Sequence, residues 1–468
     1  MKPINPNAKW KKLFSREYAV QYTEVSLRSM SPEVKGIAPF VFYEQIYVPE
    51  NSNEVCYADE TNWNKFLDKM YSKWNPSNVN NFKKVFMRTG NDYLNFAKKV
   101  SKLNLKNASN EKIIEVYKKY QKLVTRYTFF IWAAYFLNEH YAESARQIVQ
   151  KRISPYDDVH SFYEVVLAPI KRAAILELTH QVSTRKLNKN LITKLYNKYK
   201  WIPCLDIQNP AWTLKEFSAH LRDFKKKKEK TKISYLEALK KLNINAKEKK
   251  VLDAIKQFAY IKDLRDDFRR QGIYYIQKSL FNELGKRINA DIIDVAYLQE
   301  NEIVNCLDKG IVCNKNLIEE RKKGFVIFYD SNKEIICVSG SRMKELFNYL
   351  GLGEEEHNIN EIRGIVASKG TASGRIVIVK GVKDLPNVNK GDILVAVTTH
   401  PDYVPAMQKA AAIVTEEGGV TSHAAIVSRE LGIPCIVGTK IATKILNNGD
   451  NVELDGINGV IKILKRRS

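Results

Sequence analysis

Apolar and polar positions alternate mainly with a helical period over the first two thirds of the chain. The stretch Lys112–Tyr141 repeats apolar residues at three- and four-residue spacing, which is typical of a helix in a bundle. The same periodicity predicts further helices over the segments Asp157–Lys186, Lys189–Tyr199, Ser234–Leu242, Ala246–Arg287 and Ser341–Leu350. The pattern from about Trp63 to Leu307 therefore predicts a mainly helical body.

Short strands and polar connections interrupt this body. A β-like run covers Pro39–Val48, and Gly324–Asp330 with Glu334–Gly340 is expected to form a strand pair around the turn Ser331-Asn332. The charged stretch Phe224–Lys232 (FKKKKEKTK) indicates a weak internal boundary near 224–232, and residues 351–360 (GLGEEEHNIN) indicate a polar linker.

The composition and the apolar pattern of the sequence change after this linker. Residues 361–468 are rich in Val, Ile, Gly and Ala, and strand-like runs such as GRIVIV, GDILVAV and AAAIVT alternate with short helical stretches. That alternation is typical of a compact α/β domain. We therefore expect a multidomain protein, with a mainly α-helical N-terminal body with a few short strands over residues 1–355. A separate C-terminal α/β domain is expected over residues 356–468.

Charge is unevenly distributed between these two parts. The chain has a net charge of +24, of which residues 356–468 contribute only +3, from 14 Lys/Arg and 11 Asp/Glu. A positive field favours anionic partners such as nucleotides, phosphorylated substrates or nucleic acid. Much of the excess is lysine, which also suits solvated helix faces and is less fitted than arginine to bidentate recognition. Nucleic-acid binding would rest on charge alone, because no recognised motif supports it.

Several classes of protein and site are disfavoured. No apolar run approaches the ~20 residues needed to span a bilayer, and Phe129–Leu137 is expected to be a buried helix. The N-terminus lacks the features of a secretory signal, and the six cysteines form no Cys-x-x-Cys pair, which argues against a disulfide framework and a zinc site. We expect a cytosolic (cytoplasmic) protein without a metal site, in which four histidines lacking metal-type pairing are structural: His140, His160, His180 and His220.

The candidate chemistry lies in the segment Thr415–Gly438 (TEEGGVTSHAAIVSRELGIPCIVG). An apolar strand runs into Gly418-Gly419, which permits a tight turn, and a helix is expected to begin near Ser422, with Thr421 or Ser422 as its N-cap. His423 then lies in the first helical turn, where exposed amides and the helix dipole favour an anion. Spacing alone leaves a surface or capping histidine as the commoner interpretation.

The residues Gly418–Arg429 (GGVTSHAAIVSR) resemble, position by position, the active-site motif of the phosphohistidine domain in PEP-utilising enzymes. These include phosphoenolpyruvate synthase, pyruvate phosphate dikinase, Enzyme I of the sugar phosphotransferase system and rifampicin phosphotransferase. The flanking segments Gly364–Val379 and Gly391–Met407 and the closing DGINGVI resemble the family too, so that the likeness covers roughly residues 361–464. It implies a swivelling phosphohistidine domain over residues 356–468.

The resemblance also implies roles for individual residues. His423 would be the phosphoryl carrier, and Gly418, Gly419, Thr421 and Ser422 would bind the phosphoryl group. The threonine two places before the histidine is a regulatory phosphorylation target in dikinases of this family, and Thr421 fills that place. Arg429 matches the final arginine of the motif; it is a candidate phosphoryl contact, although a structural salt bridge fits its distance along the helix better.

A looser resemblance extends into the helical body. Leu264–Ile288 and Val295–Ile303 are similar to the helical region that precedes the phosphohistidine domain in phosphoenolpyruvate synthase-like and rifampicin phosphotransferase-like proteins. In the rifampicin enzyme, the equivalent helical domain binds the acceptor. This implies that Arg265, Arg269 and Tyr274 are candidate contacts to an acceptor or to the phosphoryl group, alongside a purely structural role for each.

The dikinases contain an ATP-grasp domain, but residues 1–355 carry no glycine-rich nucleotide loop, and only Lys465–Ser468 follow the histidine domain. We expect no cofactor bound by this chain alone, with ATP and Mg²⁺ on a separate ATP-grasp partner that phosphorylates His423. The phosphoryl group would then pass to a small-molecule acceptor held by the helical body. The alternative is a non-catalytic regulatory or docking subunit of a dikinase-like complex; a basic nucleic-acid-binding protein is a third interpretation.

Overall fold

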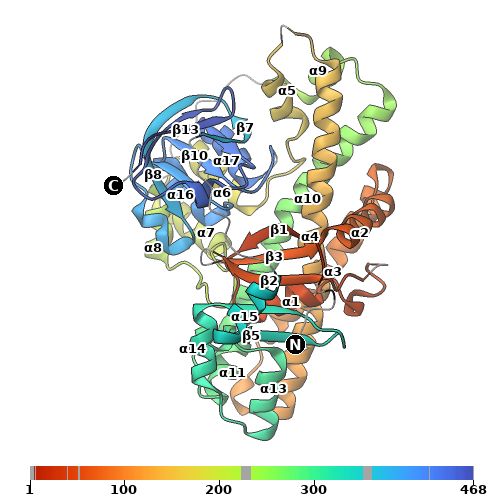
Figure 1. Cartoon of the computed structure of the whole chain (residues 1–468), viewed down its shortest axis with the longest axis vertical. Coiled ribbons are helices and arrows are strands. Elements are labelled where there is room, and N and C mark those ends of the chain that lie inside the picture. The colour runs from red at the N-terminus through yellow and green to blue at the C-terminus, as the bar shows by residue number, and fades with distance from the viewer. Residues whose placement is uncertain are drawn as a thin grey trace. The chain divides into compact units, whose positions relative to one another are not determined.

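The computed structural model describes residues 5, 7–38, 41–50, 53–155, 157–222, 233–350, 361–420 and 422–466 (Figure 1). The chain forms two compact units. The first comprises Met1–Leu137, Trp201–Ala211 and Ile261–Glu354, and the second comprises Asn138–Lys200, Trp212–Tyr260 and Glu355–Ser468. The predicted polar linker, residues 351–360, lies outside the described residues. So does the predicted boundary near 224–232, because residues 223–232 are not described. The predicted domain limits therefore stay a prediction.

The first unit is built around an antiparallel sheet with the strand order β1-β3-β2-β4-β5. The strands are β1 (Trp10–Arg16), β2 (Gln45–Glu50), β3 (Asn53–Asp59), β4 (Phe325–Tyr329) and β5 (Ile335–Ser339). The predicted strand pair is confirmed as β4 and β5, which pair antiparallel. The β-like run Pro39–Val48 is confirmed only in its second half, as β2, whereas β1 and β3 were not predicted.

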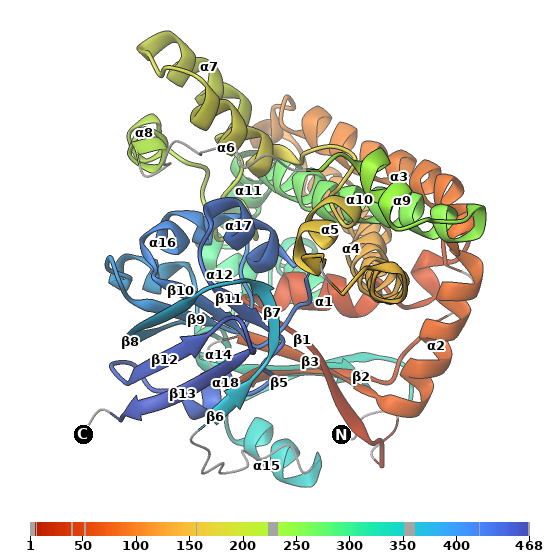
Figure 2. The ribbon, with the colours of Figure 1, turned by 90° about the horizontal axis from the view of Figure 1, so that it is seen from above.

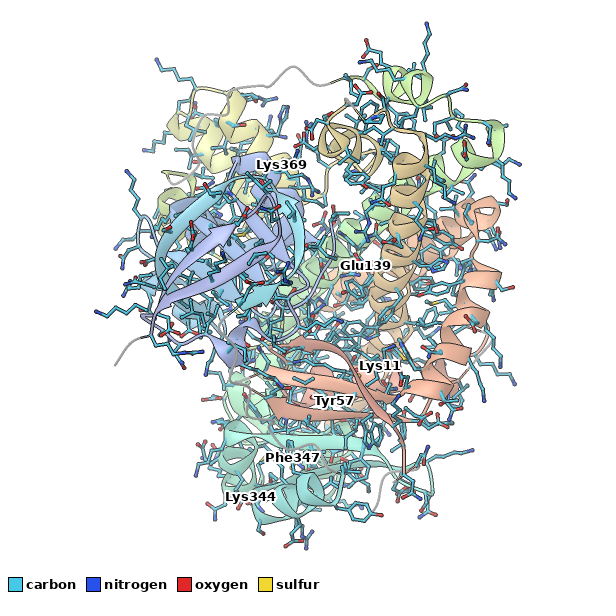
Figure 3. The ribbon with its side chains drawn as sticks, turned by 45° about the horizontal axis from the view of Figure 1, so that its top comes forward. Lys11, Tyr57, Glu139, Lys344, Phe347 and Lys369 are labelled. Carbon is cyan, nitrogen blue, oxygen red and sulfur yellow. The ribbon has the colours of Figure 1, made fainter. Side chains whose placement is uncertain are left out.

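Helices cover both faces of this sheet (Figure 2). On one face, Ile46, Val48, Val326 and Phe328 pack against α15 (Gly340–Leu350), whose Phe347 is labelled in Figure 3. On the other, the hydroxyl of Tyr47 hydrogen-bonds that of Ser26 on α1 (Val20–Arg28), and Trp132 of α4 (Asn110–Arg152) stacks on Phe14 with ring centroids 3.9 Å apart. The remaining helices of the unit are α1 (Val20–Arg28), α2 (Glu60–Lys73), α3 (Val79–Val100), α11 (Asn282–Arg287), α12 (Ile292–Ala296), α13 (Glu300–Lys309) and α14 (Lys315–Lys323).

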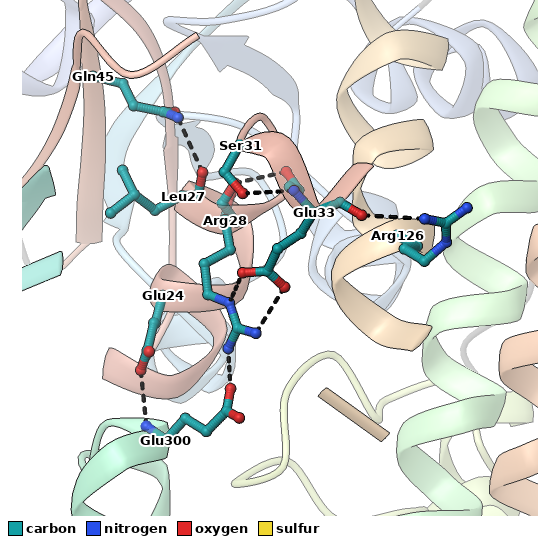
Figure 4. A network of polar contacts seen from close by, with 10 residues as sticks. Glu24, Leu27, Arg28, Ser31, Glu33, Gln45, Arg126 and Glu300 are labelled. Carbon is teal, nitrogen blue, oxygen red and sulfur yellow. Dashed lines mark hydrogen bonds and ion pairs between the residues drawn. The ribbon is translucent and has the colours of Figure 1, made fainter. Parts of the chain in front are cut away.

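A polar network ties α1 to α13 within the first unit (Figure 4). The Arg28 guanidinium donates to Glu33, with Nε 2.7 Å from Oε1, and also contacts the carboxylate of Glu300. The backbone N–H of Glu300 donates in turn to Glu24 Oε2 at 3.0 Å. Burial raises the pKa of Glu24 to about 7, and this effect exceeds the opposing hydrogen bond and the Arg28 charge.

Two long helices run through both units, α4 (Asn110–Arg152) and α10 (Ala246–Ile276). The periodicity predicted both, and Phe129–Leu137 is confirmed as a largely buried part of α4. The segment Asp157–Lys186 is two helices, because the chain leaves the helical conformation before Pro169. The shorter helices of the second unit are α5 (Val159–Val166), α6 (Ala174–Thr184), α7 (Lys189–Tyr199), α8 (Leu214–Arg222) and α9 (Tyr235–Lys241).

The C-terminal part of the second unit contains an eight-stranded sheet with the order β6-β13-β12-β8-β9-β10-β11-β7. Its strands are β6 (Glu361–Arg363), β7 (Ile365–Ser368), β8 (Thr371–Val379), β9 (Ile393–Ala396), β10 (Ala412–Thr415), β11 (Cys435–Val437), β12 (Asn451–Asp455) and β13 (Val460–Lys465). Its helices are α16 (Val404–Lys409), α17 (His423–Leu431) and α18 (Ala442–Ile445). The predicted fold class, a mainly helical body with a C-terminal α/β region, is confirmed.

Four strands of this sheet, β8, β9, β10 and β11, are parallel neighbours. The side chains of β9 and β10 are all buried, as expected of parallel strands covered on both faces. One face contributes Ile376, Val395 and Val414 to a core that α18 completes, and α17 contacts β7, β10 and β11. Because the four strands run in the same direction, the segments that follow them meet at one edge of the sheet.

No helix among the described residues is both long and apolar enough to cross a bilayer.

Candidate phosphohistidine site

His423 is the first residue of α17, as the sequence predicted. The N-cap is Ser422, whose backbone is extended (φ −66°, ψ 162°) and whose hydroxyl accepts the backbone N–H of Ala425 at 3.3 Å. The helix ends at Gly432 with φ 67°, the left-handed conformation that glycine adopts without strain. Thr421, the other predicted N-cap, lies outside the described residues.

The Gly418-Gly419 turn gives the backbone its close approach to the start of α17. Gly418 has φ +98°, and a Cβ there would lie 2.7 Å from Cβ of Ser422. A Cβ on Gly419 would lie 2.7 Å from Oε2 of Glu139 on α4 of the same unit (labelled in Figure 3). Gly418 is therefore required by its positive φ and by the nearness of Ser422, whereas a side chain at Gly419 would have to displace only the carboxylate end of Glu139.

The imidazole of His423 is oriented by a second segment of the sheet edge. Its Nδ1 lies 2.8 Å from the hydroxyl of Thr399, which follows β9. β9 is the parallel neighbour of β10, the strand that leads into the Gly-Gly turn, so the two residues meet at the carboxyl ends of adjacent strands. The hydrogen bond engages Nδ1 and fixes the plane of the ring.

Sequence reasoning missed Thr399, and it missed Glu139. Thr399 lies inside the segment Gly391–Met407, one of those that carry the family resemblance, so a signal for it was present. Glu139 belongs to α4, nearly three hundred residues before the turn, and no pattern in the sequence connects the two.

Arg429 holds the turn in place from the second half of α17. Its guanidinium donates to the backbone carbonyls of Val420 at 2.6 Å and Ala367 at 3.1 Å. Burial lowers the pKa of Arg429, and the nearby charge of Glu164 opposes that shift. Both hydrogen bonds go to backbone carbonyls, so Arg429 links the loop before His423 to β7. The sequence had favoured a structural salt bridge for this residue instead.

Arg265 and Arg269 lie in the first unit, on α10, and are nearly fully buried. Arg265 donates to the carbonyl of Ile131 at 2.8 Å, and Arg269 donates to the hydroxyl of Tyr18 at 2.9 Å and pairs with Asp266 at 3.3 Å. Burial would raise the pKa of Asp266, but the surrounding arginines outweigh it and lower that pKa to about 2. The two buried arginines thus share Asp266, whose side chain is 29% exposed, and donate to groups on other segments of the first unit.

Tyr274 is partly exposed near the C-terminal end of α10, where it lines a surface groove of the first unit. The structure therefore brings together Gly418, Gly419, Ser422 and His423, with Arg429 behind them, in the second unit. Arg265, Arg269 and Tyr274 belong to the first unit, and Thr421 lies outside the described residues.

Comparison with known proteins bears on the segment that contains this site. Residues 388–459 match the family described as PEP-utilising enzyme, mobile domain. The phosphoenolpyruvate synthase of Pyrococcus furiosus is 41% identical over 171 residues, which are 33% of this chain and 21% of that protein. A probable phosphoenolpyruvate synthase of Archaeoglobus fulgidus is 52% identical over 110 residues, 24% of this chain and 15% of that protein. The chain thus covers about a fifth or less of the length of these relatives.

Solved structures give weaker likenesses. The solution structure of an Enzyme I protein, nEIt, aligns over 70% of this chain and 80% of its own, at 14% identity and a TM-score of 0.18. The aconitase X of Thermococcus kodakaraensis aligns with 22% of this chain at 18% identity and a TM-score of 0.19. Both scores are too low for a shared fold to follow. The family match and the sequence relatives agree, however: residues 388–459 match the mobile domain of PEP-utilising enzymes, and the cited relatives are phosphoenolpyruvate synthases.

Proposed function

We propose that this chain is a phosphotransferase component in which His423 carries a phosphoryl group. The group would pass from an ATP-grasp partner that binds ATP and Mg²⁺ to a small-molecule acceptor held by the helical body. The observation that carries the proposal is the position of His423: it begins α17 directly after the Gly-Gly turn, with its Nδ1 bonded to Thr399 at 2.8 Å. A helix start favours an anion, and a phosphorylated imidazole is one.

The hydrogen bond to Thr399 supports Nε2 as the nucleophile. When Nδ1 carries the proton and donates it to the Thr399 hydroxyl, the lone pair of the neutral ring lies on Nε2. Attack by Nε2 on the β-phosphorus of ATP would form the N–P bond while the P–O bond to AMP breaks. Water would then cleave the bond to the γ-phosphate, which leaves as inorganic phosphate, so that one phosphoryl group stays on the ring. The positive charge that develops on the ring is shared with Nδ1–H, and the threonine oxygen accepts from it. Transfer to the acceptor reverses these bond changes with an acceptor oxygen in place of the nucleotide.

The backbone at the start of α17 supports binding of the transferred group. Ser422 caps the helix, and the positive φ of Gly418 lets the chain turn sharply just before it. A phosphoryl-binding or regulatory role for Thr421 stays a prediction. So do acceptor contacts from Arg265, Arg269 and Tyr274, the separate domain over residues 356–468 and a cytosolic setting.

Labelling tests the proposal directly. The full chain, mixed with an ATP-grasp protein from the same source and ATP carrying ³²P at the β position, should acquire an acid-labile label. His423→Ala should lose the label, and His400→Ala should keep it. His400 is the matched control because it lies in the same region with its Nδ1 on Asp402 at 3.0 Å. Equal labelling of the His423→Ala protein would contradict the carrier role.

A further inference from the structure

A groove of about 440 Å³ lies on the first unit, distant in sequence from the candidate phosphohistidine site. One wall is the turn after α3, including Ser101, Leu103 and Lys106, and the other runs from Tyr274 to Lys286 along the end of α10 and α11. The volume is within the range of small-molecule sites.

Helix packing explains why the groove is found here. α3 and α10 pack closely through Gly90, which faces the ring of Phe268, and through Gly272, which faces the ring of Tyr93. α3 ends at Val100, and the turn that follows, including Ser101 and Asn104, lines the groove together with the end of α10.

A π-helical turn, Gln277–Phe281, forms the middle of the second wall. Its inner residues are fixed: Gln277 is buried and donates to the carbonyls of Ile207 and Asn209, the latter at 3.1 Å. Its outer residues Lys278 and Ser279 line the groove. Single π-helical turns inside α-helices are rare and are frequently found at functional sites.

The charge of the lining is strongly positive. Lys106, Lys278 and Lys286 line the groove, and no ion pair joins any of them to a carboxylate among the residues that the structure describes. The acidic side chain of the lining, Glu283, accepts from Arg287 at 2.8 Å, so its charge is compensated. Arg287 also donates to the carbonyls of Leu105 and Ala108 and holds the opposite wall.

Neutral donors and aromatic rings complete the lining. Asn104, Asn282 and the two tyrosines Tyr274 and Tyr275 border the groove, and Lys98 lies over the ring of Tyr275 at 5.7 Å from its centroid. Lysines bind phosphate as point charges, and a concave set of three matches a doubly charged group better than a single carboxylate.

We propose that this groove binds a small phosphorylated molecule, with Lys278 and Lys286 on the phosphate and Lys106 opposite. The proposal concerns a site separate from His423 and does not depend on the carrier role. The volume of the groove, about 440 Å³, suits a small molecule. Binding of a nucleic-acid backbone in the groove is the competing outcome.

Calorimetric titration of the full chain with inorganic pyrophosphate tests the site. A salt concentration of about 0.1 M screens the long-range attraction of the chain's overall positive charge. The variant Lys278→Gln/Lys286→Gln should bind pyrophosphate about tenfold more weakly than the wild type. The matched control Lys65→Gln/Lys69→Gln removes the same charge from exposed positions of α2 in the same unit, and should stay within about twofold.

Equal affinity of the two double variants for pyrophosphate would overturn the proposal, because the binding would then come from overall charge or from another site. A parallel titration with a single-stranded 20-mer DNA separates the competing outcome. Groove-dependent binding of the DNA without saturable pyrophosphate binding would also overturn it. Thermal unfolding midpoints that agree among the three proteins would show that the folds are intact.

Discussion

The His423 site and the charged interior of the first unit are built in opposite ways. Around His423, most of the geometry comes from the backbone of one contiguous stretch, Gly418–Arg429, with Thr399 added from the neighbouring strand. In the first unit, buried arginines donate to groups far apart in sequence, Arg269 to Tyr18 and Arg265 to Ile131, in addition to facing Asp266 on their own helix. A site formed by the backbone of one contiguous segment can therefore be predicted from the sequence, whereas contacts between side chains distant in sequence cannot.

The largest expected effect is on the side-chain network of the first unit. Asp266→Asn removes the carboxylate that faces Arg265 and Arg269, whose guanidiniums are nearly buried. Removing one partner of a buried charge cluster should lower the free energy of unfolding by about 3–5 kcal/mol. Urea unfolding measures this, and Asp253→Asn, an exposed pair partner of Lys249 on the same helix, is the control. If Asp266→Asn lowered the free energy of unfolding no more than Asp253→Asn does, the buried arginines of the first unit would not depend on this carboxylate.

Glu24→Gln tests the same kind of network through pH. The pKa of Glu24 is raised to about 7 in the folded chain, above its ordinary value of 4.5, so the folded state binds more protons between these values. Stability from this group is therefore fully present below about pH 4.5 and falls as pH rises to about 7, by up to about 3 kcal/mol.

The Gln variant keeps an acceptor for the Glu300 N–H and should lose that pH dependence. Unfolding free energies at pH 5 and pH 8 measure the difference. Glu33→Gln, in the same network but on the surface, should behave as the wild type does. A Gln variant whose stability falls between these pH values as steeply as that of the wild type would assign the titration to another group.

Gly418→Ala tests the backbone side of the comparison. A side chain at φ +98° and against Ser422 should strain the turn by about 1–3 kcal/mol and reduce labelling of His423 much more than it reduces stability. Gly432→Ala is matched, because its φ is also positive but the space around it is open. Labelling rates and unfolding midpoints of both variants should be compared. Equal loss of labelling in the two would show that the close approach to Ser422 is unimportant.

Thr399→Val gives the smallest expected effect. Losing the hydrogen bond to Nδ1 should slow phosphorylation about tenfold, which corresponds to about 1.4 kcal/mol, with little change in stability. Thr399→Ser keeps the hydroxyl and should restore most of the rate. A valine variant as fast as the wild type would mean that the ring is oriented by other contacts.

Much of the fold followed from periodicity, because long helices bury one stripe and parallel strands are continuously apolar. The predicted helix Lys189–Tyr199 coincides with α7, and the helix start at His423 was found from the Gly-Gly turn and its serine cap. The strands β1 and β3 were missed because WKKLFSR and NEVCYAD carry polar residues. Their sheet is also completed by β4 and β5, which lie more than 250 residues further along the chain.

Within the site, the contiguous residues were predicted and the distant ones were not. The hydrogen bond between Thr399 and His423 and the approach of Glu139 to Gly419 depend on how strands and helices pack. The hydrogen bonds from the buried Arg265 and Arg269 likewise join α10 to Ile131 and Tyr18, which no local pattern connects to that helix.

The position of the phosphoryl group on the charged protein is the most direct test of the central claim. After reaction with the ATP-grasp partner and ATP, fragmentation mass spectrometry of the full chain would locate the group, and ³¹P resonance would distinguish the two ring nitrogens. One phosphoryl group on Nε2 of His423 is the expected result. A group on Nδ1, or on any other residue, would contradict it.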